Sequence, residues 1–256
     1  MTSGMVSAII LSHNDEDSIG KTIRSLSWCD EILVVDDYSV DRTVTLAKEE
    51  GALVFTRHLS GDFAAQRNFA LEKAKREWVL FVDSDEIVSD ELQNEIRSAV
   101  KNNDVVGYYV KRQDFLFGSP LTHGETANVM LLRLAKKNAG VWRRPVHEVW
   151  VVHGTVGYLS RPLMHYPHPN VAQFLDEINR YSSLNAEYLY SSGVKPSLWQ
   201  IIAYLKAKFL VNYIWRMGFL DGTPGVLVAL MMSFHSFLTR AKLYFLWKHR
   251  ISELTV

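Results

Sequence analysis

Short apolar runs alternate with helix-like spacings through the first hundred residues. Residues 6–11 form a run rich in branched side chains, Ile19, Ile23 and Leu26 recur at helical spacing, and a second run follows at 32–35. The same alternation predicts strands at 53–56 and 78–82, and helices at about 40–50, at about 63–75 and after residue 90. Because the runs are continuous, they are typical of strands that helices cover on both faces. The pattern predicts a doubly wound, mostly parallel α/β sheet flanked by helices.

Beyond residue 104 the pattern changes twice. Strands of mixed polarity are expected at 107–112, 129–134 and 149–152, separated by loops rich in Gly, Pro and His. From residue 171 only helical spacing remains, with a predicted break at 222–225 and a last helix at about 226–248. The expected division is an α/β half (1–104), a loop-rich region of the same domain (105–170) and a C-terminal helical appendage (171–256).

The charges of the chain balance, but they are unevenly placed. The 28 basic and 28 acidic residues give a net charge of zero, which argues against a protein that coats nucleic acid. Residues 195–250 nevertheless hold eight Lys or Arg and one acid, Asp221, and therefore carry +7, whereas residues 1–194 carry −6. A basic tail on an acidic body suggests two separate tasks.

The single cysteine, Cys29, cannot form an internal disulfide, and the N-terminal residues do not have the pattern of a secretory leader. We therefore expect a reducing, cytoplasmic setting. We interpret Cys29 as a small buried residue and not as a reactive thiol.

Polar side chains follow three of the predicted strands directly, and in an open α/β sheet ligands bind beyond the carboxyl ends of the strands. These strand ends are 12–16, 36–39 and 83–86. No Gly-rich dinucleotide turn and no P-loop is present, so bound phosphates would be neutralised in another way. A divalent cation such as Mg²⁺ or Mn²⁺, held by Asp83 and Asp85, would do so. The alternative is that Asp83, Ser84 and Asp85 form only a solvated turn that caps a helix.

These residues are part of a wider likeness. The chain resembles the inverting glycosyltransferases of family 2, which have the nucleotide-sugar-binding fold called GT-A. The segments that carry the resemblance are VSAIILSHNDEDSIGKTIRSL, DEILVVDDYSVDRTVTLAKEEGA and AAQRNFALEKAKREWVLFVDSDE. Two later segments, RLAKKNAGVWRRPVHEVW and GFLDGTPGVLVALMMSFHSFLTRAKLY, are similar to a subgroup that includes lipopolysaccharide core glucosyltransferases.

The resemblance implies roles for residues on the donor side, within 1–104. Ser12 would line the nucleotide pocket, Asp37 would accept a hydrogen bond from uracil, and Arg67 would lie near the donor pyrophosphate, with Ser84 also on this side. Structural alternatives are a surface helix position for Arg67 and a helix-starting turn for Asp36 and Asp37. The family often has Gly at the position of Tyr38, which leaves the geometry of that turn open.

An inverting transfer needs a base that takes the proton of the acceptor hydroxyl, and a carboxylate usually serves. Glu148, just before a predicted strand in the region 105–170, is the first candidate, and Asp114 is the second. A purely structural Glu148 is the alternative. The resemblance also favours His147 as a donor contact and His165 as a third metal ligand.

The C-terminal segment combines its charge of +7 with 11 of the 30 aromatic residues. Such a segment suits an anionic membrane surface, whereas the apolar stretch 226–238 is interrupted by polar residues and is expected to be too short to span a bilayer. The alternative is that these helices pack on the sheet or form a homo-oligomer.

Together these features predict an inverting, metal-dependent enzyme that moves a hexose, glucose-like, from a UDP-sugar to a lipid-linked surface glycan such as lipopolysaccharide core. The enzyme would lie peripherally on the cytoplasmic face of the membrane. Two alternatives stay open: a transferase that glycosylates a polyprenyl phosphate or a peptide, and a non-catalytic scaffold that only binds the nucleotide sugar.

Overall fold

The computed structural model describes residues 4–127, 129–145, 148–167 and 170–253, with side chains up to residue 248. The chain forms two compact units. The first comprises residues up to 113 together with 129–165, and the second comprises 114–128 together with 166–256. The segment 114–128 therefore belongs with the C-terminal helices and not with the strands on either side of it.

The first unit is built on a mixed sheet in which the first four long strands are parallel. The strand order is β3-β2-β1-β4-β8-β6-β12-β5, and β11 pairs in parallel with β6. Its strands are β1 (Val6–Ser12), β2 (Glu31–Asp36), β3 (Leu53–Thr56), β4 (Trp78–Asp83), β5 (Glu86–Ile87), β6 (Gly107–Leu116), β8 (Val129–Lys136), β11 (Val156–Tyr158) and β12 (Leu163–His165). The mostly parallel α/β sheet expected from the sequence is confirmed.

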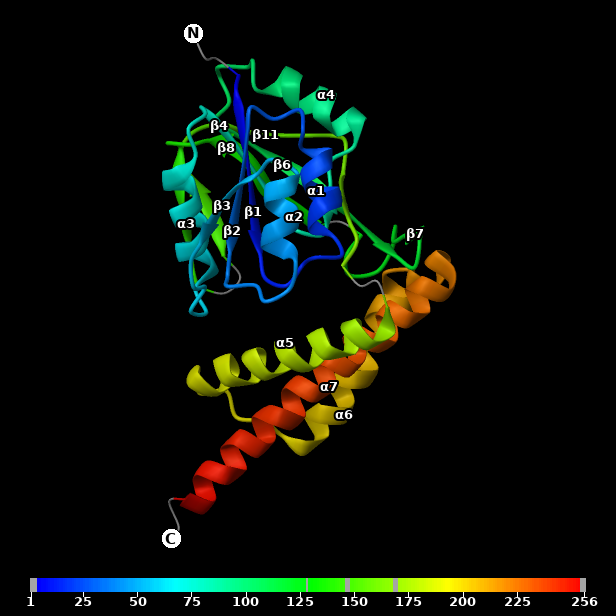
Figure 1. Cartoon of the computed structure of the whole chain (residues 1–256). Helices are drawn as coiled ribbons and strands as arrows, with labels where there is room; N and C mark the ends of the chain where they lie inside the picture. The colour runs from blue at the N-terminus through cyan, green and yellow to red at the C-terminus, as the bar shows by residue number, and fades with distance from the viewer. Residues whose placement is uncertain (1–3, 128, 146–147, 168–169, 254–256) are drawn as a thin grey trace. The chain divides into compact units, whose positions relative to one another are not determined.

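Helices cover both faces of this sheet, as the continuous apolar strands predict (Figure 1). On one face Ile10 and Leu80 pack with buried residues of α1 (Ile19–Ser25), α2 (Thr43–Glu49) and α4 (Asp90–Ala99). On the other face Ile9 and Phe81 pack with α3 (Phe63–Lys73). Alternate residues of a strand point to opposite faces, so β4 contributes to both cores.

A separate hairpin packs on the same face as α3. Its strands β9 (Gly140–Arg143) and β10 (Val149–Val152) are antiparallel, and their rings Trp142 and Trp150 stack at 5.4 Å and meet Phe81 edge-on. A Cβ on Gly140 would lie 1.9 Å from the Val151 carbonyl oxygen, so only glycine allows this close pairing.

The second unit consists of helices and the segment 114–128. In it α7 (Gly222–Glu253) packs against α5 (Val171–Ser191) and α6 (Leu198–Leu210), and β7 (Ser119–Pro120) pairs with the end of β6. Polar contacts hold the segment to the helices: Glu125 binds Lys208 at 2.6 Å, and the His123 amide donates to Asp221 at 2.8 Å.

One expectation about the C-terminal helices was wrong. The break lies before residue 222, because α6 passes into a π-helical turn, η1 (Val211–Trp215), and a 3-10 turn, η2 (Gly218–Asp221). Residues 222–225 instead begin α7, where the first turn tolerates a proline that has no N–H to donate. The stretch Gly218–Lys248 is also long and apolar enough to cross a membrane, by length and composition only, and 33% of the tested window is buried.

Candidate active site

The ends of three parallel strands meet at one edge of the sheet. Ser12 is paired in register with Asp36, and Leu11 with Asp83, so the last residues of β1, β2 and β4 are neighbours. Each of these strands ends where its apolar run ends. The sheet therefore brings the three polar strand ends together as the sequence predicts.

The two adjacent aspartates at the end of β2, Asp36 and Asp37, have different surroundings. Asp36 is buried, accepts from the amide and hydroxyl of Ser39, and receives the Ser12 hydroxyl at 3.3 Å. Asp37 is more open and accepts from the Leu59 amide at 3.0 Å. Asp36 thus holds the turn together, whereas the Asp37 carboxylate lies at its surface.

Tyr38 takes a left-handed conformation at φ 51°, which glycine adopts more easily. Its ring stacks on His58 with centroids 3.8 Å apart. The geometry of this turn is therefore the one that glycine, common at this position in the family, would also adopt. Tyr38 adds an aromatic ring to it.

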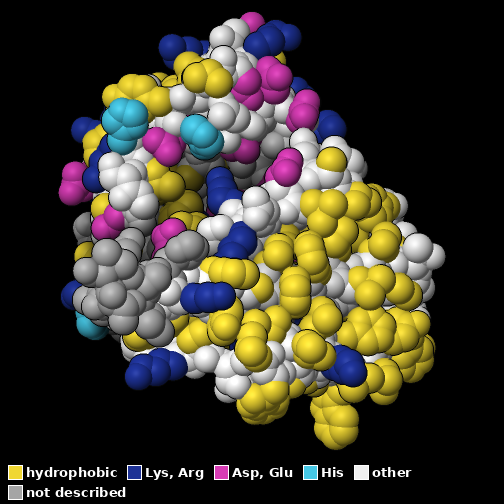
Figure 2. All heavy atoms as spheres, turned by 90° about the horizontal axis from the view of Figure 1, so that it is seen from below, with side chains coloured by type: hydrophobic (Ala, Val, Ile, Leu, Met, Phe, Trp, Pro, Cys, Tyr) yellow, Lys and Arg dark blue, Asp and Glu magenta, His cyan; other side chains and the backbone are white. Residues whose placement is uncertain are grey.

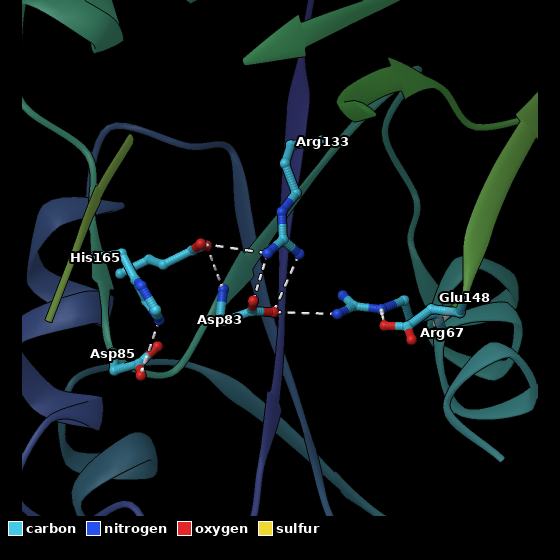
Figure 3. A network of polar contacts seen from close by, with 7 residues as sticks. Arg67, Asp83, Asp85, Arg133, Glu148 and His165 are labelled. Carbon is cyan, nitrogen blue, oxygen red and sulfur yellow. Dashed lines mark hydrogen bonds and ion pairs between the residues drawn. The ribbon is translucent and has the colours of Figure 1, made fainter. Parts of the chain in front are cut away.

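The carboxylate of Asp83 lies at the centre of a charged network (Figure 3). Arg133, from β8, donates to both of its oxygens, with 3.1 Å between Nη1 and Oδ1, and also reaches Glu86 at 3.2 Å. Arg67, from α3, donates from Nη2 to Asp83 Oδ1 at 3.1 Å and from Nε to Glu148 Oε1 at 3.0 Å. Three carboxylates thus share two guanidinium groups.

Burial and charge act in opposite directions on this network. Burial would raise the pKa of Asp83, but the adjacent guanidinium groups of Arg133 and Arg67 outweigh it and lower that pKa well below its usual range. Glu86 is fully buried, and burial raises its pKa despite the contact with Arg133. Asp83 is therefore firmly ionised, whereas Glu86 is the carboxyl that takes up a proton more readily.

Asp85 lies apart from this network and faces His165, with 3.3 Å between Oδ2 and Nε2 (Figure 3). Within the described ranges, no three His, Cys, Asp or Glu side chains converge on a point where an ion could be held. Asp85 and His165 nevertheless fit Mg²⁺ or Mn²⁺, because such ions use one or two protein ligands together with phosphate oxygens and water. Asp83 offers less, since both its oxygens are occupied.

Asp15, from the loop after β1, is a further acidic group beside this turn. Burial raises the pKa of its carboxyl to about 6. The negative charge of Asp85 adds to the shift, and a hydrogen bond with the Ser84 side chain opposes it. The Ser84 side chain therefore joins this turn to the loop after β1.

The two candidate bases lie in different units. Glu148 directly precedes β10, the second strand of the hairpin, and forms an ion pair with Arg67. Its side chain is 18% exposed. Asp114 is buried on β6 within the second unit, where its carbonyl oxygen accepts from the Leu121 amide at 2.8 Å. His147 lies outside the described residues. Glu148 is thus the candidate that shares a network with the strand ends.

Sequence reasoning did not find Arg133 or Glu86. A signal existed for Arg133, because it is the one charged residue in the apolar run 129–135, and a charge in a buried strand needs a partner. In the sequence Glu86 is one residue of a polar strand end, whereas in the structure its side chain is completely buried.

The chain is similar to known proteins over most of its length. Residues 7–161 match the family model described as Glycosyl transferase family 2. Lipopolysaccharide core biosynthesis glycosyltransferase LpsC of Rhizobium meliloti (strain 1021) is 31% identical over 252 residues, which covers 93% of this chain and 92% of the relative. Uncharacterized glycosyltransferase RT0209 of Rickettsia typhi is 29% identical over 252 residues, which covers 93% of this chain and 86% of the relative.

Among solved structures, S. aureus TarS 1-349 in complex with UDP-GlcNAc has a similar fold. The TM-score is 0.50 at 17% sequence identity, and the match covers 91% of this chain and 81% of that chain.

Proposed function

The chain belongs to glycosyl transferase family 2, and from this premise we propose that it transfers a hexose from a UDP-sugar to a lipid-linked surface glycan such as lipopolysaccharide core, with inversion. The observation that carries the proposal is the network in Figure 3, in which Arg67 joins Glu148 to Asp83, the last residue of β4. The name of the relative LpsC supports the glycan class, and the complex of TarS with UDP-GlcNAc supports the nucleotide.

In this proposal Glu148 takes the proton from the acceptor hydroxyl as its oxygen attacks the anomeric carbon. Attack comes from the face opposite the diphosphate, so the bond to UDP breaks as the new glycosidic bond forms and the configuration inverts. Asp37 and Ser12 lie at the strand ends where the nucleotide would bind. Asp114 stays the second candidate for the base.

Asp85, with His165 beside it, would hold Mg²⁺ or Mn²⁺. A divalent cation there would offset the negative charge that develops on the departing diphosphate. The chain itself would contribute the carboxylate of Asp85, which lies in the turn after β4, next to the ends of the parallel strands.

Calorimetry with UDP tests the donor half. Wild type should bind UDP in the presence of MnCl₂, and EDTA should weaken the binding by about 10-fold or more. Asp85→Asn should remove this dependence on Mn²⁺, whereas Asp90→Asn, the same change at an exposed carboxyl of α4, should preserve it. Equal UDP affinity in MnCl₂ and in EDTA would refute the metal site.

For the acceptor side we propose that α6 and the turns η1 and η2 lie on an anionic membrane. No residue of α6 is buried, although most of its side chains are apolar. Leu198, Trp199 and Ile202 are all more than half exposed, and Trp215 in η1 is 84% exposed. Figure 2 shows hydrophobic side chains gathered in a broad area with a few basic ones among them.

Charge favours a lipid surface over a second copy as the occupant of this face. Across residues 198–221, which span α6, η1 and η2, the basic residues Lys206, Lys208 and Arg216 outnumber the one acid, Asp221, which already accepts hydrogen bonds from Thr122 and His123. Two such faces would repel each other, whereas anionic headgroups would attract the Lys and Arg as the tryptophans enter the interface. We therefore propose a peripheral position, on the cytoplasmic face of the membrane.

Sedimentation with vesicles tests this surface. Wild type should pellet with vesicles of phosphatidylglycerol and much less with phosphatidylcholine alone, and high salt should release it. Changing Trp199 and Trp215 to Ser should reduce binding by about 10-fold or more. Tyr158→Ser, at an aromatic residue of the first unit that is 70% exposed, should have no effect. Release only by detergent would indicate a spanning α7, and dimers that ignore vesicles would indicate an oligomer interface.

A further inference from the structure

The carboxylate of Asp83 is already paired with two guanidinium groups of the chain itself. Arg133 donates to both of its oxygens, and Arg67 makes a third contact at 3.1 Å. Both guanidinium groups are almost completely buried. A carboxylate that already accepts three charged hydrogen bonds has little capacity left for an ion.

Arg67 is held as firmly as the carboxylate that it contacts. It comes from the middle of α3, and its guanidinium lies 4.7 Å from the ring centroid of Trp142 and 5.3 Å from that of Phe81. The planar fork presents Nη2 to Asp83 and Nε to Glu148. One rigid group thereby sets the positions of two carboxylates relative to each other.

The hairpin that carries Glu148 depends on the same helix. The Asn68 side chain donates to the Trp142 carbonyl and accepts from the Trp142 amide, both at 2.9 Å. The Phe63 amide donates to the Pro145 carbonyl at 2.9 Å. These contacts place the backbone of the hairpin, and Arg67 then places the carboxylate.

We propose that Arg67 is a positioning residue for Glu148, and that Asp83, held by Arg133, acts by fixing Arg67 and not by binding the cation. The proposal rests on the proposed function, in which Glu148 is the base. Donor binding and proton removal are then served by different carboxylates of one turn: Asp85 faces the cation site, and Asp83 supports the base.

A double-mutant cycle on turnover tests the link to Glu148. The assay follows release of UDP, with lipid extract as acceptor, from whichever of UDP-glucose, UDP-galactose and UDP-N-acetylglucosamine wild type consumes fastest. Arg67→Lys keeps the charge but loses the fork, so kcat should fall by about 10-fold or more while KM for the donor changes by less than about 3-fold. Arg57→Lys is the matched control, because Arg57 also lies over an aromatic ring and donates to a side chain, Gln66.

The decisive variant combines Arg67→Lys with Glu148→Gln. Glu148→Gln alone should lower kcat by about 100-fold or more, as loss of a general base does. If Arg67 acts through Glu148, adding Arg67→Lys should cause no further loss. Losses that multiply would overturn the proposal, since a purely structural role of Arg67 would not depend on Glu148. Should Arg67→Lys fail to fold, Asp83→Asn, which keeps the side-chain shape, takes its place in the same cycle.

Calorimetry with UDP and MnCl₂ tests the role of Asp83. Asp83→Asn should keep Mn²⁺-dependent affinity within about 3-fold of wild type, whereas Asp85→Asn should lose it. Equal losses in both variants would show that Asp83 holds the cation and would overturn this proposal alone. Failure of wild type to bind UDP or to consume any of the donors would instead refute the proposed function on which it rests.

Discussion

Replacing Arg133 by Met tests whether the buried network stabilises the first unit. Arg133 is 5% exposed and is the guanidinium in contact with Glu86, whose side chain is completely buried. Met fills a similar volume but leaves that carboxyl with no adjacent guanidinium and leaves Asp83 with Arg67 only. Breaking a buried ion pair from one side costs about 3–5 kcal/mol, a large share of the roughly 5–15 kcal/mol that stabilises a domain.

The loss should depend on pH in a defined direction. The folded-state pKa of Glu86 is already raised by burial, and removing Arg133 raises it further. A carboxyl with a raised folded pKa favours the folded state at low pH and loses that contribution as pH rises through the folded value. The cost of Arg133→Met should therefore be larger at pH 8 than at pH 5, and adding Glu86→Gln should recover part of it.

Urea unfolding followed by circular dichroism at both pH values measures these differences. Lys136→Met is the matched control on the same strand, because Lys136 forms a partly exposed ion pair with Glu77 at 3.7 Å that should contribute less than about 1 kcal/mol. If Arg133→Met is as mild as Lys136→Met, or if its cost falls as pH rises, the account of the network is wrong.

Two further predictions concern elements around the site. Glu95 accepts three hydrogen bonds of 2.8 Å from Ser160 and Arg161, which outweigh its partial burial and lower its pKa, so Glu95→Gln should cost about 1–3 kcal/mol at pH 7. That cost should shrink as pH falls below about 4.5, because a lowered carboxyl pKa contributes stability only while the group is ionised; a pH-independent cost in urea titrations would contradict this. Gly140→Ala should force β9 and β10 apart, costing about 1–3 kcal/mol in thermal unfolding and lowering turnover, whereas Gly20→Ala in α1 should be neutral or slightly stabilising. A fully active, fully stable Gly140→Ala protein would refute the close pairing.

The edge of the sheet where the three polar strand ends meet was predictable, because its signals are local. The apolar runs before Ser12, Asp36 and Asp83 mark buried strands, and the polar residues after them mark where those strands end. The register of parallel strands then brings the ends together without further information. The same reasoning placed Glu148 just before the last strand of the hairpin.

The partners of Asp83 and Asp85 were not predictable, because they are distant in sequence. Arg133 is fifty residues from Asp83, and no local pattern indicates which carboxylate it contacts. The helix break at 222–225 was misplaced for a related reason: glycine and proline also suit the first turn of a helix, and the chain had already turned at Met217, which has a positive φ.

Turnover of a UDP-sugar tests the central claim most directly. Wild type, supplied with membrane lipid extract, should release UDP in MnCl₂ or MgCl₂, should stop in excess chelator, and should lose about 100-fold or more of its rate with Glu148→Gln. Release of UDP that is unaffected by the chelator and by Glu148→Gln would contradict the account. UDP that is bound while no donor is ever consumed would identify a scaffold and not an enzyme.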